Sequence, residues 1–104
     1  MIKDEDLDHA ILRIVFHRPS EPTYQGSSGD WLRLVQRDVP EADFIDLKLA
    51  FTRLRNNRKV HLINDDGIPY SGNEADDERF FYTGRFTASA TDEGRSYWNR
   101  LRHG

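Results

Sequence analysis

The first apolar pattern along the chain is helical. Between Asp4 and His17 the apolar side chains recur at intervals of three and four residues, as on one face of a helix, and they are Leu7, Ala10, Ile11, Ile14 and Val15. Acidic residues at the start of this segment and basic residues at its end suit the helix dipole. Pro19 follows, and proline ends a helix. We therefore predict the first helix over residues 4–17.

Two more helices are predicted beyond a loop at 19–29, which is rich in proline, glycine and serine. The short second helix carries the apolar part of segment 31–35, has Ser28 or Asp30 as its cap, and stops before Pro40. The third is expected over residues 41–56, since proline suits a first helical turn. Its inward face is the set Phe44, Leu47, Ala50, Phe51 and Leu54. Asn57 is expected to end it in the left-handed conformation.

After residue 58 the helical pattern is replaced by an alternation of polar and apolar residues, which is typical of a strand. We predict a strand over 59–63, then a long polar connection to about residue 78. The aromatic segment 79–87 is predicted as a second strand, with one of its faces buried. A last helix is expected over 92–102, capped by Thr91, with Tyr97 and Trp98 in the core.

Two segments resemble small bacterial regulators of the MarR and PadR kind, which have a winged helix-turn-helix domain. Residues 49–60 (LAFTRLRNNRKV) are similar to the end of a recognition helix that leads into a wing strand. Residues 86–98 (FTASATDEGRSYW) are similar to the turn from the wing into a final helix. The resemblance covers about residues 4–101. It implies an α+β winged-helix fold in one domain over 1–104, with a three-helix core, a two- to three-stranded antiparallel wing and a C-terminal helix.

The composition fits such a domain and excludes several classes of protein. The chain has 104 residues, of which 37% are hydrophobic and 32% charged, enough for one core. With no cysteine, disulfides and thiolate metal sites are excluded. No apolar stretch reaches membrane-spanning length, and no apolar segment typical of a secretory signal follows the acidic start. We expect a cytoplasmic monomer or homodimer without a membrane partner.

The resemblance implies that the third helix enters the major groove of double-stranded DNA. Basic residues gather in the second half of this helix and just beyond it. The candidate DNA-binding residues are Lys48, Thr52, Arg53, Arg55, Arg58 and Lys59. Cations are favoured at any helix C-terminus, so a merely solvated helix end stays open. The leading function is therefore a non-enzymatic DNA-binding protein, such as a small transcription regulator.

The charge of the expected wing indicates a different partner. Residues 60–78 contain six acids and no lysine or arginine, and the acids are Asp65, Asp66, Glu74, Asp76, Asp77 and Glu78. Carboxylates repel phosphates, whereas affinity for DNA grows with the phosphates that are neutralised. The alternative function is a winged-helix protein-interaction module or adaptor whose acidic wing binds a basic protein.

Candidate chemistry is sparse. The four histidines are far apart in the sequence, and Asp65-Asp66-Gly67 lacks the alternating acids of a calcium loop. The serines lack a nucleophile elbow, and Gly26-Ser27-Ser28-Gly29 lacks the lysine of a phosphate-binding loop. Asp76, Asp77 and Glu78 lie in a polar segment, where we expect solvated carboxylates rather than a general acid. We expect no catalytic residues, metal or cofactor.

Overall fold

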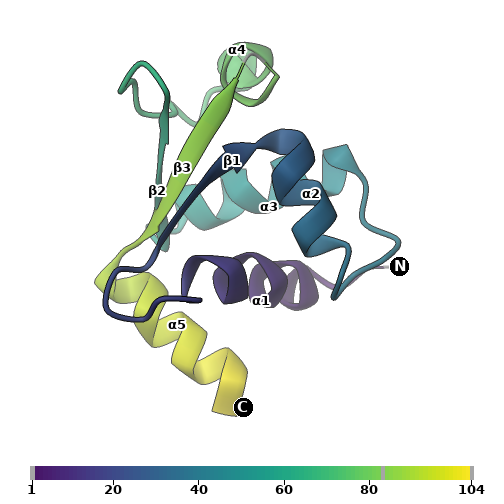
Figure 1. Cartoon of the computed structure of the whole chain (residues 1–104), viewed down its shortest axis with the longest axis vertical. Coiled ribbons are helices and arrows are strands. Elements are labelled where there is room, and N and C mark those ends of the chain that lie inside the picture. Colours follow the sequence, from purple (N-terminus) through teal and green to yellow (C-terminus); the bar gives the residue numbers. More distant parts are fainter. Residues whose placement is uncertain (1, 83, 104) are drawn as a thin grey trace.

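The protein is an α+β structure in which helices pack on one antiparallel sheet. The computed structural model describes residues 2–82 and 84–103. The helices in that part of the chain are α1 (Asp4–Val15), α2 (Ser28–Val35), α3 (Phe44–Asn56), the short α4 (Asp77–Phe81) and α5 (Asp92–His103), with a 3-10 turn η1 (Glu74–Asp76) before α4. The strands are β1 (Thr23–Ser27), β2 (Val60–Asn64) and β3 (Arg85–Ala90). Figure 1 shows α1 and α3 on one side of the sheet and α5 below it.

The sheet has the order β1-β3-β2, and both pairings are antiparallel. Strand β3 is central, with Gly26 opposite Phe86 on one side and Leu62 opposite Ala88 on the other. The predicted loop at 19–29 is wrong in its second half, which forms β1. This strand is short and lies at the sheet edge. Its glycine and serine content alone favours a loop, and pairing with β3 stabilises it as a strand.

Strand β1 runs directly into α2. The helix cap is Ser27, the last residue of the strand, rather than Ser28 or Asp30. Asp30 completes a capping box, in which its backbone N–H donates to Ser27 Oγ (3.1 Å) and its carboxylate accepts from Ser27 N (3.1 Å). Strand and helix therefore share one residue as their junction.

The predicted strand 79–87 is wrong over its first half. Phe80 and Phe81 lie in α4, and the strand begins at Arg85; Thr83 lies outside the described residues. Both phenylalanines are buried. Consecutive residues of a strand point to opposite faces, so a helical turn places both of these side chains in the core where a strand would expose one.

Helix ends differ from the prediction by a few residues. Helix α1 ends at Val15. Helix α3 begins at Phe44 rather than Glu41, because Asp43 and Asp46 form a capping box there. The left-handed residue after α3 is Arg58 (φ 59°), and Asn57 has φ −90°. Thr91 caps α5 as predicted, with its Oγ1 accepting from Gly94 N at 2.9 Å.

The buried side chains form one cluster with Trp31 at its centre. Its ring centroid lies 4.9 Å from that of Phe51 and 5.9 Å from that of Phe86, so α2, α3 and β3 meet there. Trp98 of α5 is buried as predicted and stacks on Phe16 with ring centroids 5.9 Å apart. No helix among the described residues has the length and apolar content to span a bilayer.

Candidate interaction surfaces

The sequence-predicted cations of α3 divide into two groups, and the first is engaged inside the molecule. Lys48 Nζ lies 3.4 Å from Asp77 Oδ2, which joins α3 to α4. Arg53 forms an ion pair with Asp8 of α1, and its Nη1 lies 3.5 Å from Asp4 Oδ1. Both cationic side chains are mostly covered, with 21% of Lys48 and 26% of Arg53 exposed, although the sequence suggests them as DNA-binding residues. These two charges are already compensated before any partner arrives.

Asp8 connects three helices. Its carboxylate is buried, accepts from Arg53 of α3, and accepts from Tyr97 Oη of α5 at 2.6 Å. Burial raises the pKa of Asp8, while the hydrogen bonds from Tyr97 and Arg53 act in the opposite direction. The pKa of Tyr97 is raised, first by burial and then by its hydrogen bond to Asp8. Arg53 is thus part of a structural anchor.

Asp77 has a similar role at the other end of α3. It was predicted as a solvated acid of the wing, but it is buried and accepts a hydrogen bond from Tyr70 Oη. Burial, followed by this hydrogen bond, raises the pKa of Tyr70 to about 12. Thr52 is half-buried beside it, with its hydroxyl donating to Lys48 O (2.9 Å) and lying 3.4 Å from Tyr70 Oη. Thr52 and Asp77 therefore support α3 from within.

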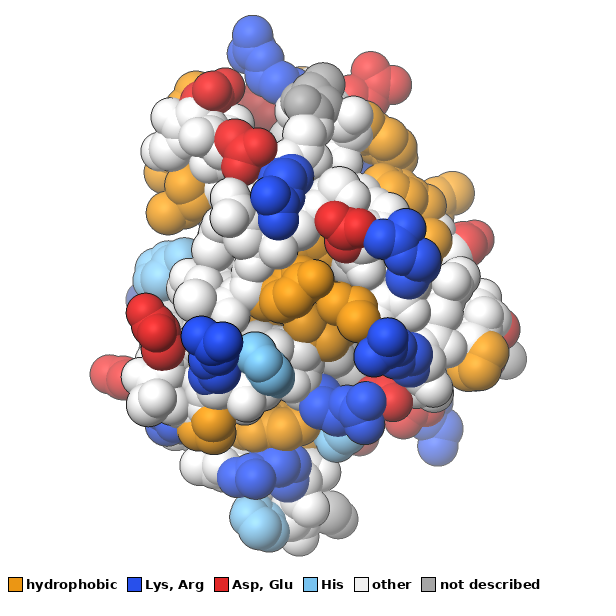
Figure 2. Space-filling view, in the orientation of Figure 1, with side chains coloured by type: hydrophobic (Ala, Val, Ile, Leu, Met, Phe, Trp, Pro, Cys, Tyr) orange, Lys and Arg blue, Asp and Glu red, His pale blue; other side chains and the backbone are white. Residues whose placement is uncertain are grey.

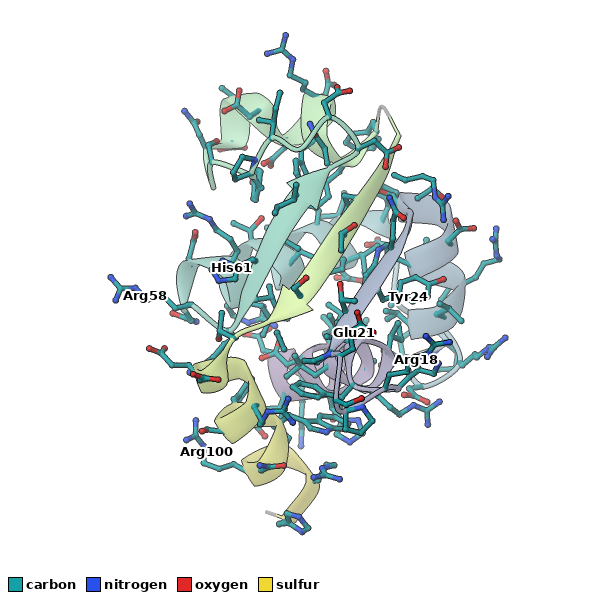
Figure 3. All side chains as sticks on the ribbon, turned by 60° about the vertical axis from the view of Figure 1, so that its left-hand side comes forward. Arg18, Glu21, Tyr24, Arg58, His61 and Arg100 are labelled. Atoms are coloured by element: carbon teal, nitrogen blue, oxygen red, sulfur yellow. The ribbon has the colours of Figure 1, made fainter. Side chains whose placement is uncertain are left out.

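The remaining predicted cations lie together at the C-terminal end of α3. Arg55 donates to Asn56 Oδ1 (3.0 Å), Arg58 is exposed, and Lys59 Nζ lies 5.4 Å from the centroid of the Tyr97 ring. Among the described residues none of the three cations forms an ion pair with a carboxylate. Figure 3 shows Arg58 beside the start of β2, where His61 lies.

The outer face of α3 carries two exposed apolar side chains in its first half, which we did not predict from the sequence. Ile45 and Leu49 are 59% and 56% exposed and lie one turn apart. Tyr82 follows α4, is 54% exposed, and stacks on Phe44 at 4.7 Å between ring centroids. We call Phe44, Ile45, Leu49 and Tyr82 the α3–α4 face. The available signal was the position of Ile45 and Leu49, which share an i, i+4 spacing away from the inward stripe.

The predicted acidic residues separate into three places. Asp65 and Asp66 are exposed at the turn after β2, where Asp65 accepts from Gln25 Nε2 at 2.9 Å. Glu74 and Glu78 are exposed on η1 and α4, and Asp76 between them accepts from Ser71 Oγ at 2.7 Å. With Asp77 buried, the remaining acids on the elements of the α3–α4 face are Glu74, Asp76 and Glu78 on η1 and α4, and Asp43 and Asp46 at the start of α3. No metal-binding cluster of three acidic or histidine side chains occurs in the described ranges.

Comparisons with known proteins add no relative: no family model, no curated protein and no solved structure matches the chain.

Proposed function

We propose that the chain is a winged-helix domain that acts as a protein-interaction module and binds a basic, apolar segment of a partner protein on its α3–α4 face. The order of α1, β1, α2, α3, β2 and β3, with a three-stranded antiparallel sheet, supports the winged-helix assignment. The observation that carries the function is the apolar outer surface of α3. In a DNA-binding domain this surface would offer cations and polar groups to the major groove.

Two side chains supply an energetic reason for docking. Ile45 and Leu49 are each more than half exposed, so covering them would contribute about 1 kcal/mol or more per side chain. Exposed Tyr82 extends this surface toward α4, and tyrosine is enriched at protein interfaces. The partner segment is therefore expected to present apolar side chains to α3.

Charge sets the other property of the partner. Asp43 and Asp46 lie at the start of α3, and Glu74 and Glu78 lie on η1 and α4. The nearby Lys48 is compensated by Asp77. Lysine or arginine side chains at the rim of the partner segment would complement these carboxylates and speed the encounter. An amphipathic helix with an apolar stripe and a basic border has both required properties.

The direct test uses a fluorescent amphipathic helical peptide of leucine and lysine, titrated with the protein and followed by anisotropy. We expect saturable binding, and binding at least tenfold weaker for the double variant Ile45→Ser/Leu49→Ser, because about 2 kcal/mol of apolar burial is lost. Ile68→Ser is the matched control, since Ile68 is 58% exposed but lies on the turn after β2.

A second pair of variants tests the charge. Glu74→Lys/Glu78→Lys is expected to weaken binding, whereas Glu21→Lys in the loop before β1 is expected to leave it unchanged. A peptide with glutamate in place of lysine should not bind. Equal binding of the two peptides, or equal loss in the Ile45/Leu49 and Ile68 variants, would remove this function.

Duplex DNA is the second candidate, supported by Arg55, Arg58 and Lys59 at the end of α3, which lack carboxylate partners within the described ranges. Using Arg53 for phosphate as well would leave Asp8 buried without its cation, which is costly. Titration with duplex DNA at low and moderate salt tests this candidate. Binding at low salt that is lost in Arg55→Gln/Arg58→Gln would favour it, and no binding at low salt would exclude it.

A further inference from the structure

An arginine-lined groove of about 460 Å³ lies between α1, α2 and α5, away from the α3–α4 face. Its four arginines are Arg13 of α1, Arg37 just after α2, and Arg95 and Arg102 of α5. Among the described residues, no aspartate or glutamate lines the groove. This concentration of positive charge is unexpected in a protein with a formal net charge of −3.

Three of these arginines are held in place by contacts within the protein, but most of their charge is uncompensated. Arg95 donates from Nη2 to Pro19 O (2.9 Å), and its guanidinium lies 5.2 Å from the Phe16 ring centroid. Arg102 donates from Nη2 to Asn99 Oδ1 at 2.7 Å. Only Arg13 has an ion-pair partner, Asp38 at 3.2 Å from its Nε, as far as the described part of the chain extends. Guanidinium groups that are already ordered lose less entropy when they bind an anion.

The floor of the groove is apolar and aromatic. Phe16 and Trp98 stack beneath Arg95 and Arg102, whose guanidinium groups lie over the two rings. Half-buried Tyr24 and Leu34 line the groove beside them. Figure 2 shows hydrophobic surface in the middle of this face with lysine and arginine side chains around it, and Figure 3 shows Tyr24 on β1.

We propose that this groove binds a nucleotide that carries two or more phosphates. Half-buried Tyr24 and Leu34 offer apolar surface to a base, whereas the Phe16 and Trp98 rings are covered by the Arg95 and Arg102 guanidinium groups. Several guanidinium groups suit phosphate oxygens, which arginine can bind through two parallel hydrogen bonds. A ligand with a single negative charge would leave most of the arginines without a partner. The volume is sufficient for a small molecule and falls within the range of ligand pockets.

The two tryptophans make this proposal measurable. Trp98 lines the groove, whereas Trp31 is in the core, so their indole N–H signals in a ¹⁵N-labelled sample report the site and the fold separately. We expect ADP to shift the Trp98 signal saturably and to leave the Trp31 signal in place. Adenosine has the ring without the charge, and tripolyphosphate has the charge without the ring. Each is expected to bind at least tenfold more weakly than ADP.

Exposed arginines provide the variants. Arg37→Gln/Arg102→Gln should weaken ADP binding at least tenfold, while Arg100→Gln, on α5 but outside the groove, should bind like the wild type. Arg100 lies over the Tyr97 ring at 5.7 Å from its centroid. Unchanged affinity in the double variant, or tripolyphosphate or adenosine binding as well as ADP, would overturn the nucleotide assignment. Ile45→Ser/Leu49→Ser should bind ADP normally, so this test is independent of the proposed protein interface.

Discussion

Replacing Asp8 by alanine tests the anchor that joins α1, α3 and α5. The change removes the ion pair with Arg53 and the hydrogen bond from Tyr97. Hydrogen bonds to a charged group contribute about 1.5–3 kcal/mol each, while relief of carboxylate burial offsets part of this loss. We expect the free energy of unfolding to fall by about 2–3 kcal/mol at pH 7, which lowers Tm by about 10 °C or more.

Urea unfolding followed by circular dichroism measures this difference, with the slope m expected to stay unchanged. Asp6→Ala is the matched control, because Asp6 is on the same helix with the same charge but is exposed. It should cost less than about 1 kcal/mol, the range of a helix-dipole interaction. Adding Tyr97→Phe to Asp8→Ala should cost little more than Asp8→Ala alone. If Asp8→Ala behaved like Asp6→Ala, the anchor would contribute nothing to stability.

The same residue sets a pH dependence. Burial raises the pKa of Asp8, so the folded protein holds this proton more tightly than the unfolded chain does. The stability that protonated Asp8 contributes is fully present below the ordinary aspartate pKa of about 4. It is lost as the pH rises through the pKa of Asp8 in the folded protein. The stability difference between wild type and Asp8→Ala should therefore be larger near pH 4 than at pH 7. A difference that grew with pH would show that the ionised carboxylate is the favoured form.

The remaining predictions concern two close contacts. Tyr70→Phe should lower the free energy of unfolding by about 1–2 kcal/mol, since buried Asp77 loses its donor. In the wild type, ultraviolet titration should find Tyr70 protonated beyond pH 11, because its pKa is raised to about 12. Gly94→Ala should destabilise by about 2 kcal/mol or more, since its Cβ would meet Lys59 O at 2.0 Å. Gly29 is also helical, but a Cβ there would have only Ser27 Oγ within 4 Å, at 3.8 Å, so Gly29→Ala should be neutral or stabilising. Urea unfolding measures both variants. Equal losses of stability in Gly94→Ala and Gly29→Ala would contradict the packing explanation.

Helix positions followed from local sequence to a large extent. Four of the five predicted inward residues of α3 are buried, namely Leu47, Ala50, Phe51 and Leu54, whereas Phe44 is half-buried and stacks on Tyr82 instead. The Thr91 cap of α5 is confirmed, and both outcomes follow because apolar periodicity and cap chemistry act within a few residues. Strand β1 was missed because its stability comes from pairing with β3, more than 50 residues later in the chain. The helix that contains Phe80 and Phe81 was missed for a related reason. Its conformation is determined by the burial of both side chains in the core, and not by a repeating apolar pattern in the neighbouring sequence.

The candidate surfaces were less accessible to sequence reasoning. Lys48 and Arg53 were predicted as DNA-binding residues, but each forms an ion pair with an acid distant in sequence, Asp77 and Asp8 respectively, and no local pattern indicates those pairs. The exposed pair Ile45 and Leu49 was visible as a spacing, yet only the packed structure reveals that nothing in the described chain covers it.

Because of helix α4, the segment between β2 and β3 is part of the hydrophobic core and is more than a surface turn. A hairpin turn can be shortened, lengthened or cut with little effect on the domain that carries it. Here Phe80 packs against Phe86, and Phe81 packs against both Phe51 and Phe86, the two rings that also contact Trp31. Their amides should exchange with solvent only when the whole domain opens. The shortest version of this chain that still folds must therefore retain α4.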